Sequence, residues 1–117
     1  MSSEIVFLYG WGPEEEGRLS SLLYMMETAV DMNMQVAVFF FADAAVLAKE
    51  EVFAKFDQEI RRRMDGLKGN EKAKFFVCEQ STRKRGIQKE TLQDGMMVMG
   101  YAAFLDMATS GKTVITI

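Results

Sequence analysis

The stretch Gln35-Val-Ala-Val-Phe-Phe-Phe41 is apolar at every position after its first residue. A short run rich in β-branched and aromatic residues predicts a β-strand, and the lack of polar alternation indicates that both faces of this strand are covered. Such burial is typical of a central strand in a parallel sheet. We therefore expect the fold to be built around residues 35–41.

Strands and helices are expected to alternate along the rest of the chain. The predicted strands are residues 4–8, 35–41, 75–77, 96–99 and 113–117, the predicted helices are residues 14–33, 44–49, 50–67 and 101–108, and a short helix or turn is predicted at residues 87–92. Ser110-Gly111-Lys112 predicts a turn into the last strand. This alternation predicts a parallel sheet in an α/β layered domain, and a length of 117 residues suits a single domain over residues 1–117.

The composition excludes several kinds of chemistry. The chain has one cysteine and no histidine, which excludes an intramolecular disulfide, a Cys-rich zinc site and imidazole catalysis. We expect no metal and no cofactor. The N-terminus lacks the plan of a signal peptide and no apolar run has the length of a membrane span, which predicts a cytoplasmic protein without a membrane partner.

Charge is distributed unevenly although the net charge is only −3. Residues 1–60 carry a balance of −8, whereas residues 61–90 carry a balance of +6. The basic middle is suited to an acidic protein partner or an anionic sulfur species. Nucleic acid is not an expected partner, because the pI is about 5.0 and aromatic residues are not interleaved with the cations.

Cys78 is the first candidate for covalent chemistry. It follows the apolar run 75–77, so it is expected where a strand ends and a loop begins, at the sheet edge where ligands collect in parallel α/β folds. Arg83, Lys84 and Arg85 follow in this loop, and cations near a thiol favour its reactive thiolate form. The alternative interpretation is that Cys78 is a small apolar residue at the end of a core strand, beside a solvated basic turn.

Asp43 and the loop that contains Gly10 and Gly12 also follow predicted strands. Asp43 follows the central strand and is predicted to cap the helix at residues 44–49, although it would also suit the mouth of a site as a polar group. Gly10 and Gly12 lie between a strand and a helix, as in loops that cradle phosphate. Nucleotide binding is the weaker interpretation of this loop, because Glu15 replaces the third glycine of the dinucleotide motif and neighbouring glutamates would repel an anion.

The C-terminal third is rich in methionine and small apolar residues. The helix at residues 101–108 is apolar enough that it must be buried, either in the core or in a subunit contact. Four of the ten methionines are Met96, Met97, Met99 and Met107. These side chains are expected to fill the core or a subunit interface, and a thioether copper site is the less favoured alternative.

The segment from Phe75 to Ile87 begins a more specific pattern. It is followed by Leu92-Gln93-Asp94-Gly95-Met96, Gly100, Phe104-Leu105 and Thr113 to Ile117, and together these residues resemble the DsrE family of small sulfur-relay proteins, which has TusD-like and YchN-like members. The most specific part is a strand-ending cysteine followed eight residues later by a glycine and an aliphatic residue, here Cys78 and Gly86-Ile87. The resemblance extends over essentially the whole chain.

The resemblance implies a three-layer α/β/α sandwich on a five-stranded parallel sheet, assembled as a homotrimer or homohexamer. It also implies that Cys78 accepts sulfane sulfur as a persulfide and passes it to a partner such as a TusA-like carrier, which would make the chain sulfurtransferase-like. The anion would be stabilised by the cations after Cys78. Ser81 stands where some YchN-like members have a second cysteine, so a resolving step within the chain is excluded. The alternative is an oligomeric binding or regulatory module with an inert cysteine.

Overall fold

A computed structural model describes residues 4–110 and 112–117 of the chain. The strands are β1 (Ile5–Tyr9), β2 (Val36–Phe40), β3 (Ala73–Cys78), β4 (Met96–Met99) and β5 (Thr113–Thr116). The helices are α1 (Glu16–Asp31), α2 (Glu50–Phe53), α3 (Gln58–Lys68), α4 (Glu79–Lys84) and α5 (Tyr101–Ala108), with 3-10 helices η1 (Ala42–Ala48) and η2 (Lys89–Thr91). The turn predicted at residues 110–112 includes Gly111, which lies outside the described residues.

The five strands form one parallel sheet in the order β4-β3-β2-β1-β5. β2 is the central strand, and all five of its residues are buried. Val36 lies between Ile5 of β1 and Ala73 of β3, so the three inner strands run in register from their amino ends. The prediction that residues 35–41 form a central strand covered on both faces is confirmed.

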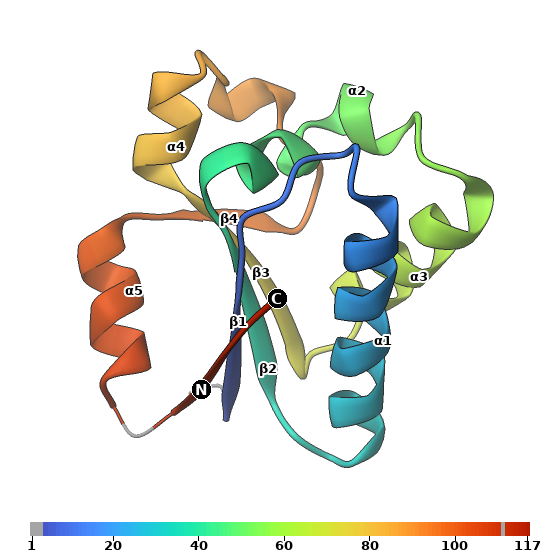
Figure 1. Ribbon diagram of the computed structural model, residues 1–117, viewed down its shortest axis with the longest axis vertical. Coiled ribbons are helices and arrows are strands. Elements are labelled where there is room, and N and C mark those ends of the chain that lie inside the picture. The colour runs from blue at the N-terminus through green and yellow to red at the C-terminus, as the bar shows by residue number, and fades with distance from the viewer. Residues whose placement is uncertain (1–3, 111) are drawn as a thin grey trace.

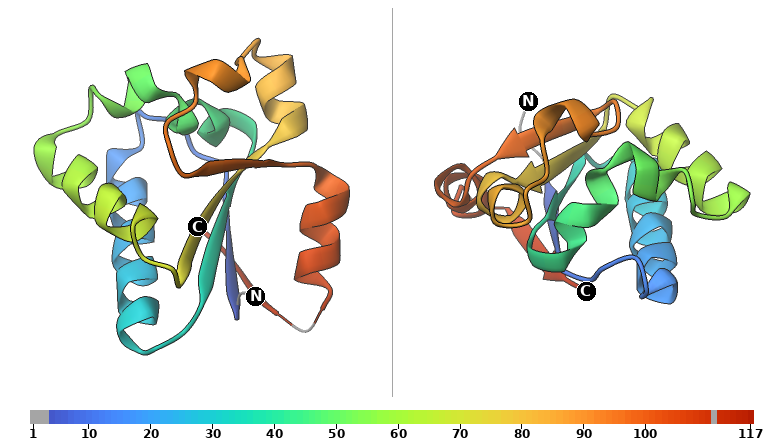
Figure 2. Two further views of the ribbon diagram at one scale, coloured as in Figure 1. Left: turned by 180° about the vertical axis from the view of Figure 1, so that it is seen from behind. Right: turned by 90° about the horizontal axis from the view of Figure 1, so that it is seen from above.

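Helices cover both faces of the sheet, which confirms the three-layer α/β/α prediction. Figure 1 shows the sheet edge-on, with α1 and α3 on one face and α5 on the other. The larger core, between the sheet and α1 and α3, includes Phe40 and Phe75. The smaller core lies under α5 and includes Phe39, Cys78 and Phe104. Figure 2, seen from above, shows η1 and α4 over the carboxyl ends of the strands.

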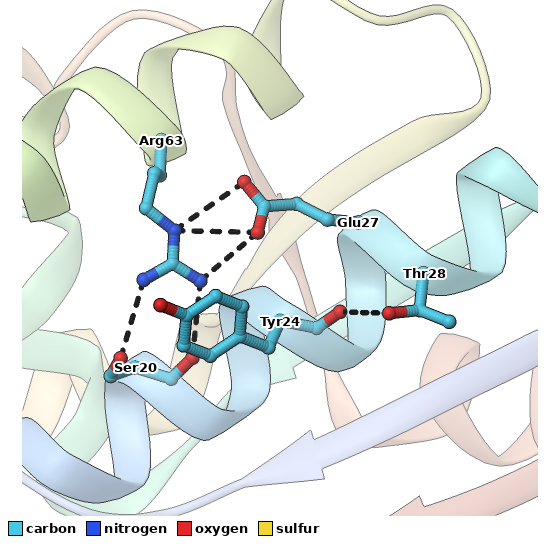
Figure 3. A network of polar contacts seen from close by, with 5 residues as sticks. All are labelled: Ser20, Tyr24, Glu27, Thr28 and Arg63. Atoms are coloured by element: carbon cyan, nitrogen blue, oxygen red, sulfur yellow. Dashed lines mark hydrogen bonds and ion pairs between the residues drawn. The ribbon is translucent and has the colours of Figure 1, made fainter.

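Arg63 joins α1 to α3. Its guanidinium donates from Nη2 to Glu27 Oε1 at 3.0 Å and from Nη1 to Ser20 Oγ at 3.2 Å, while its plane stacks on the Tyr24 ring at 3.7 Å (Figure 3). Burial alone lowers the pKa of Arg63, but the hydrogen bonds and charge of Glu27 outweigh burial and raise it. The arginine is therefore held in its charged form between the two helices.

The single helix predicted at residues 50–67 is wrong, because the segment contains two helices. α2 ends at Phe53, and α3 begins after Asp57, whose Oδ1 accepts from the Ile60 amide at 2.9 Å. An aspartate in this position satisfies one of the free amides at a helix start. The same hydrogen bond is the main cause that lowers the pKa of Asp57. The apolar spacing continues across the break, which is why periodicity alone missed it.

The start of α1 also differs by two residues from the prediction. The Glu15 amide donates to the Gly12 carbonyl at 3.1 Å, so residues 12–15 form a turn and the helix begins at Glu16. α1 ends at Asp31, and Asn33 takes a left-handed conformation with φ of 67°. Asparagine tolerates this conformation at the end of a helix.

α5 is largely exposed, so it is not a core helix of its own chain. Phe104 is its buried residue, whereas Tyr101 and Leu105 are 42% and 57% exposed. The predicted burial of α5 in a subunit contact stays a prediction. In the described ranges, no helix is both long enough and apolar enough to cross a membrane.

The four C-terminal methionines do not converge on one site. Met96 packs against the larger core, Met99 and Met107 pack against the smaller core, and Met97 is exposed. Successive strand residues point to opposite faces, which separates Met96 from Met97 and Met99 from Val98. This alternation places Met96 on the opposite face from the other three methionines, so the four do not form one thioether copper site, and packing roles are favoured. Across residues 4–110 and 112–117, acidic, cysteine and histidine side chains form no group of three suited to a metal.

Candidate functional site

Cys78 lies at the point where β3 ends and α4 begins. Its Sγ accepts a hydrogen bond from the Ser81 amide at 3.4 Å, as the N-cap of α4, and donates to Gln80 Oε1 at 3.6 Å. The side chain has no exposed surface in the isolated chain. The predicted position at the carboxyl edge of the sheet is correct, but the predicted loop after Cys78 is wrong because residues 79–84 are helical.

α4 forms because its ends are well terminated. Glu79 lies in the first turn, and Arg83 and Lys84 lie in the last, so the charges complement the helix dipole. Gly86 follows with φ of 65°, its amide donates to the Arg83 carbonyl at 3.1 Å, and the Ile87 amide donates to the Thr82 carbonyl at 2.9 Å. These two bonds are those of a Schellman motif. Gly86 is therefore the residue that ends α4.

Ser81 connects the ends of β3 and β2. Its hydroxyl accepts a hydrogen bond from the Ala42 amide at 2.8 Å, while its own amide donates to Cys78 Sγ. Ala42 has a φ of 52°, a left-handed conformation that costs energy in a residue with a side chain. The strained turn after β2 is thus held against the helix that begins at the thiol.

The predicted cations lie on the last turn of α4 and beyond it. Arg85 forms an ion pair with Asp43 at 2.8 Å and donates to the Ser81 carbonyl at 3.3 Å. Arg83 pairs with Glu79 at 3.3 Å on the exposed side of the helix. Lys84 is exposed and forms no ion pair with the residues that the structure describes. Within the described ranges, none of these cations forms a hydrogen bond with Cys78 Sγ.

Asp43 is not the cap that was predicted. η1 begins at Ala42, its N-cap is Phe41, and no side chain caps it. Asp43 instead lies in the first turn of η1, where its carboxylate points to Arg85. This pairing places Asp43 at the carboxyl edge of the sheet, and its predicted role at the mouth of a site stays a prediction.

The glycine loop after β1 packs at the same carboxyl edge of the sheet. A Cβ on Gly10 would lie 2.9 Å from the Phe41 ring, so the absence of a side chain there lets the loop pack against the end of β2. A Cβ on Gly12 would lie 2.7 Å from a Glu14 carboxylate oxygen. A phosphate cradled at Gly12 would face that carboxylate, which disfavours the nucleotide interpretation.

Residues 3–117 match the DsrE/DsrF-like family, which is nearly the whole chain. The chain belongs to this family. Two solved structures resemble this DsrE-like chain. YchN from E. coli has a TM-score of 0.78 and 19% identity, and the match covers all of both chains. MTH1491 from Methanobacterium thermoautotrophicum, a protein of unknown function, has a TM-score of 0.76 and 18% identity, and the match covers 97% of both chains. At these identities the likeness concerns the fold.

One curated relative matches the DsrE-like chain at the level of sequence. The uncharacterized protein MJ0760 of Methanocaldococcus jannaschii is 31% identical over an alignment of 90 residues, and this alignment covers 70% of this chain. The match covers 31% of the relative, so the chain spans about a third of that protein's length.

The site of this DsrE-like chain places a thiol beside a backbone donor. The Ser81 amide can stabilise negative charge on Cys78 Sγ, because hydrogen bonds to an anion are stronger than those to a neutral group. Sequence reasoning named Cys78 and Ser81 as candidates, and the structure adds Gln80, whose Oε1 contacts the Cys78 sulfur. An uncharged residue two positions after a cysteine has no distinctive pattern, so only its contact with the sulfur identifies it.

Proposed function

We propose that the chain is a cytoplasmic sulfur carrier that holds sulfane sulfur as a persulfide on Cys78. The observation that carries this proposal is the hydrogen bond from the Ser81 amide to Cys78 Sγ at the carboxyl end of β3. Membership of the DsrE/DsrF-like family supports a sulfur-relay role. A thiol with a fixed backbone donor is suited to a step in which sulfur becomes anionic.

The chemistry requires only thiolates and sulfane sulfur. The Cys78 thiolate attacks the terminal sulfur of a polysulfide, forms an Sγ–S bond, and displaces a polysulfide anion one sulfur shorter. The thiolate of a partner then attacks the outer sulfur of Cys78–S–S⁻, forms a new persulfide, and releases the Cys78 thiolate. Electrons balance in both steps without an external oxidant or reductant, and no histidine is needed.

The partner proposed for the second step is a small TusA-like carrier. Arg83 and Lys84 are exposed in the last turn of α4, the helix that begins at the thiol, so they are placed to meet an acidic surface. Arg85 has a different role, because its ion pair with Asp43 holds α4 to η1. Charge complementarity of this kind speeds the encounter of two proteins more than it tightens their complex.

We also expect the chain to act as a homotrimer or homohexamer that uses the α5 face. A parallel sheet is normally covered on both faces, but one short helix covers this face of five strands. The exposed apolar side chains on this face are Met97, Tyr101, Leu105 and Val114. Val114 pairs with Val6 of the smaller core and Met97 pairs with Phe76, which places both on the α5 side.

The complete burial of Cys78 favours a second candidate function. Cys78 packs with Phe39 and Phe104 in the smaller core. A thiol that never opens to reagents would be an apolar core residue. The chain would then be an oligomeric binding or regulatory module with the same fold.

The test is sulfur loading of the native protein, read by intact mass. Wild-type protein treated with polysulfide is expected to gain one sulfur that is lost to a small thiol acceptor, and Cys78→Ser is expected to gain none. Met32→Ser is the matched control, because Met32 is exposed at the far end of α1. A Cys78 thiol that takes no sulfur and is alkylated only in denaturant would overturn the carrier function and favour the binding module.

A further inference from the structure

Gln80 lies over the thiol as the second residue of α4. Its side-chain Oε1 is 3.6 Å from Cys78 Sγ, and both of its amide atoms lie 3.7 Å from the point that a Cβ on Gly100 would occupy. Gly100 is the N-cap of α5. The Gln80 amide therefore spans the gap between the start of α4 and the start of α5, directly beside the sulfur.

Apart from Ser81, whose amide donates to the sulfur, the other neighbours of the thiol are apolar. Cys78 shares its core with Val6, Phe39 and Phe104, and half-buried Phe41 and Met99 pack against the same cluster. Gln80 is exposed although its amide touches a thiol that is fully buried. An approach to the sulfur from solvent thus meets Gln80 first, whereas every approach through the cluster requires aromatic or aliphatic side chains to separate.

The Gln80 side chain is held weakly enough to move. Its contact with Cys78 Sγ is the one hydrogen bond that it makes with the residues described. A thiol donor to an amide oxygen is a weak bond, and an exposed side chain changes rotamer within nanoseconds. Rotation of Gln80 would break this contact with the thiol without unfolding α4.

An amide also suits both forms of the sulfur. In the neutral form, the S–H group donates to Gln80 Oε1, as observed. In a thiolate or persulfide anion the S–H donor is lost, and the amide can turn so that its N–H group donates to the sulfur instead. A carboxylate at this position could accept but never donate, and its charge would oppose the anion.

We infer that Gln80 is a gate and positioning residue for Cys78, which shields the thiol when closed and donates to the anionic sulfur when turned. The role toward the persulfide rests on the proposed function, whereas the control of access to the thiol does not. Gln80 joins Ser81 as the second donor, one from the backbone and one from a side chain that can move.

The test compares Gln80→Ala and Gln80→Glu with wild type. Iodoacetamide alkylation of the native thiol is expected to be about two- to fivefold faster in Gln80→Ala, the factor that corresponds to removal of one weak hydrogen bond, and slower than wild type in Gln80→Glu. The half-life of the persulfide in buffer is expected to fall in both variants. Gln88→Ala and Gln88→Glu are the matched controls, because Gln88 is exposed and its side chain makes no hydrogen bond with a described residue.

The outcomes separate the gate from the carrier. Equal alkylation rates in wild type, Gln80→Ala and Gln80→Glu would overturn the gate, even if wild type still takes up sulfur. Altered alkylation rates without any sulfur uptake would support the gate and overturn the carrier function. Circular dichroism of each variant confirms that the fold is unchanged, and Gln80→Asn gives a second variant whose shorter amide should alkylate like Gln80→Ala.

Discussion

Tyr9 has a polar group in the core that is not satisfied. Its side chain is fully buried at the end of β1, against Phe40, and its hydroxyl has no hydrogen-bond partner among the residues that the structure describes. A buried hydroxyl without a partner costs the free energy of its lost hydration. Burial raises the pKa of Tyr9 well above its ordinary value, since the phenolate would be desolvated.

We expect Tyr9→Phe to increase the free energy of unfolding by about 1 kcal/mol, because it removes an unsatisfied polar group and keeps the ring. The gain should grow at high pH. The unfolded chain loses the phenolic proton near pH 10, whereas the folded chain keeps it to higher pH. The free energy of unfolding of wild type therefore falls as pH rises above that value. Urea unfolding at about pH 8 and about pH 11 measures this.

Tyr101→Phe serves as the control, because Tyr101 is partly exposed on α5. Above about pH 10, the free energy of unfolding should fall less steeply with pH in Tyr9→Phe than in wild type or the control. The same pH dependence in all three proteins would contradict the account of the buried hydroxyl.

At the scale of elements, α4 shows how one residue fixes the position at which a helix ends. Gly86 ends α4 in the left-handed region, with φ of 65°, and has no atom within 4 Å of its hypothetical Cβ. The cost of a side chain there is therefore a backbone cost and not a clash. Gly66 has equally free space but lies inside α3.

We expect Gly86→Ala to lower the free energy of unfolding by about 1 kcal/mol, because alanine is strained at positive φ. Gly66→Ala should raise it by about 0.5–1 kcal/mol, because alanine favours a helix interior. Paired chemical denaturation of the two variants measures the opposite signs. If both variants were destabilised, the space for the added methyl group, rather than the backbone conformation, would determine the change in stability at these positions.

The whole molecule has two unequal faces. The face under α1 and α3 is covered by two helices that Arg63 joins, whereas α5 alone covers the other face and leaves Met97 and Val114 of the sheet exposed around the layer that contains Cys78. Exposed apolar patches of this kind mark interaction surfaces. Self-association through this face would bury α5 together with the exposed apolar side chains around the layer that contains Cys78.

We expect Leu105→Glu to weaken self-association at least about tenfold, because a charge would be buried at the centre of an apolar contact. Sedimentation equilibrium of the native protein measures the change. Met32→Glu is the matched control, since Met32 is equally exposed at the end of α1 on the other face. A monomeric wild type, or equal dissociation of both variants, would exclude the α5 face as the interface.

The sequence by itself determined the layered α/β fold and the place of Cys78. Residues 35–41 predict a central strand because a fully apolar run can be covered only from both sides. Local patterns were less informative at Asp57, because the apolar spacing of a helix continues through the position where the aspartate starts a new helix. They also failed at Asp43, where an ion pair with Arg85 replaces the expected cap.

The tertiary structure alone decided which polar groups meet at the carboxyl edge of the sheet. Asp43 and Arg85 are 42 residues apart, and Ala42 and Ser81 are 39 apart, yet each pair meets because β2 and β3 end side by side. Gln80 reaches Gly100 for the same reason, since β4 lies beside β3. Hydrophobic periodicity determines which surface of an element is buried, whereas the partner of a polar group depends on neighbours that only the folded chain brings together.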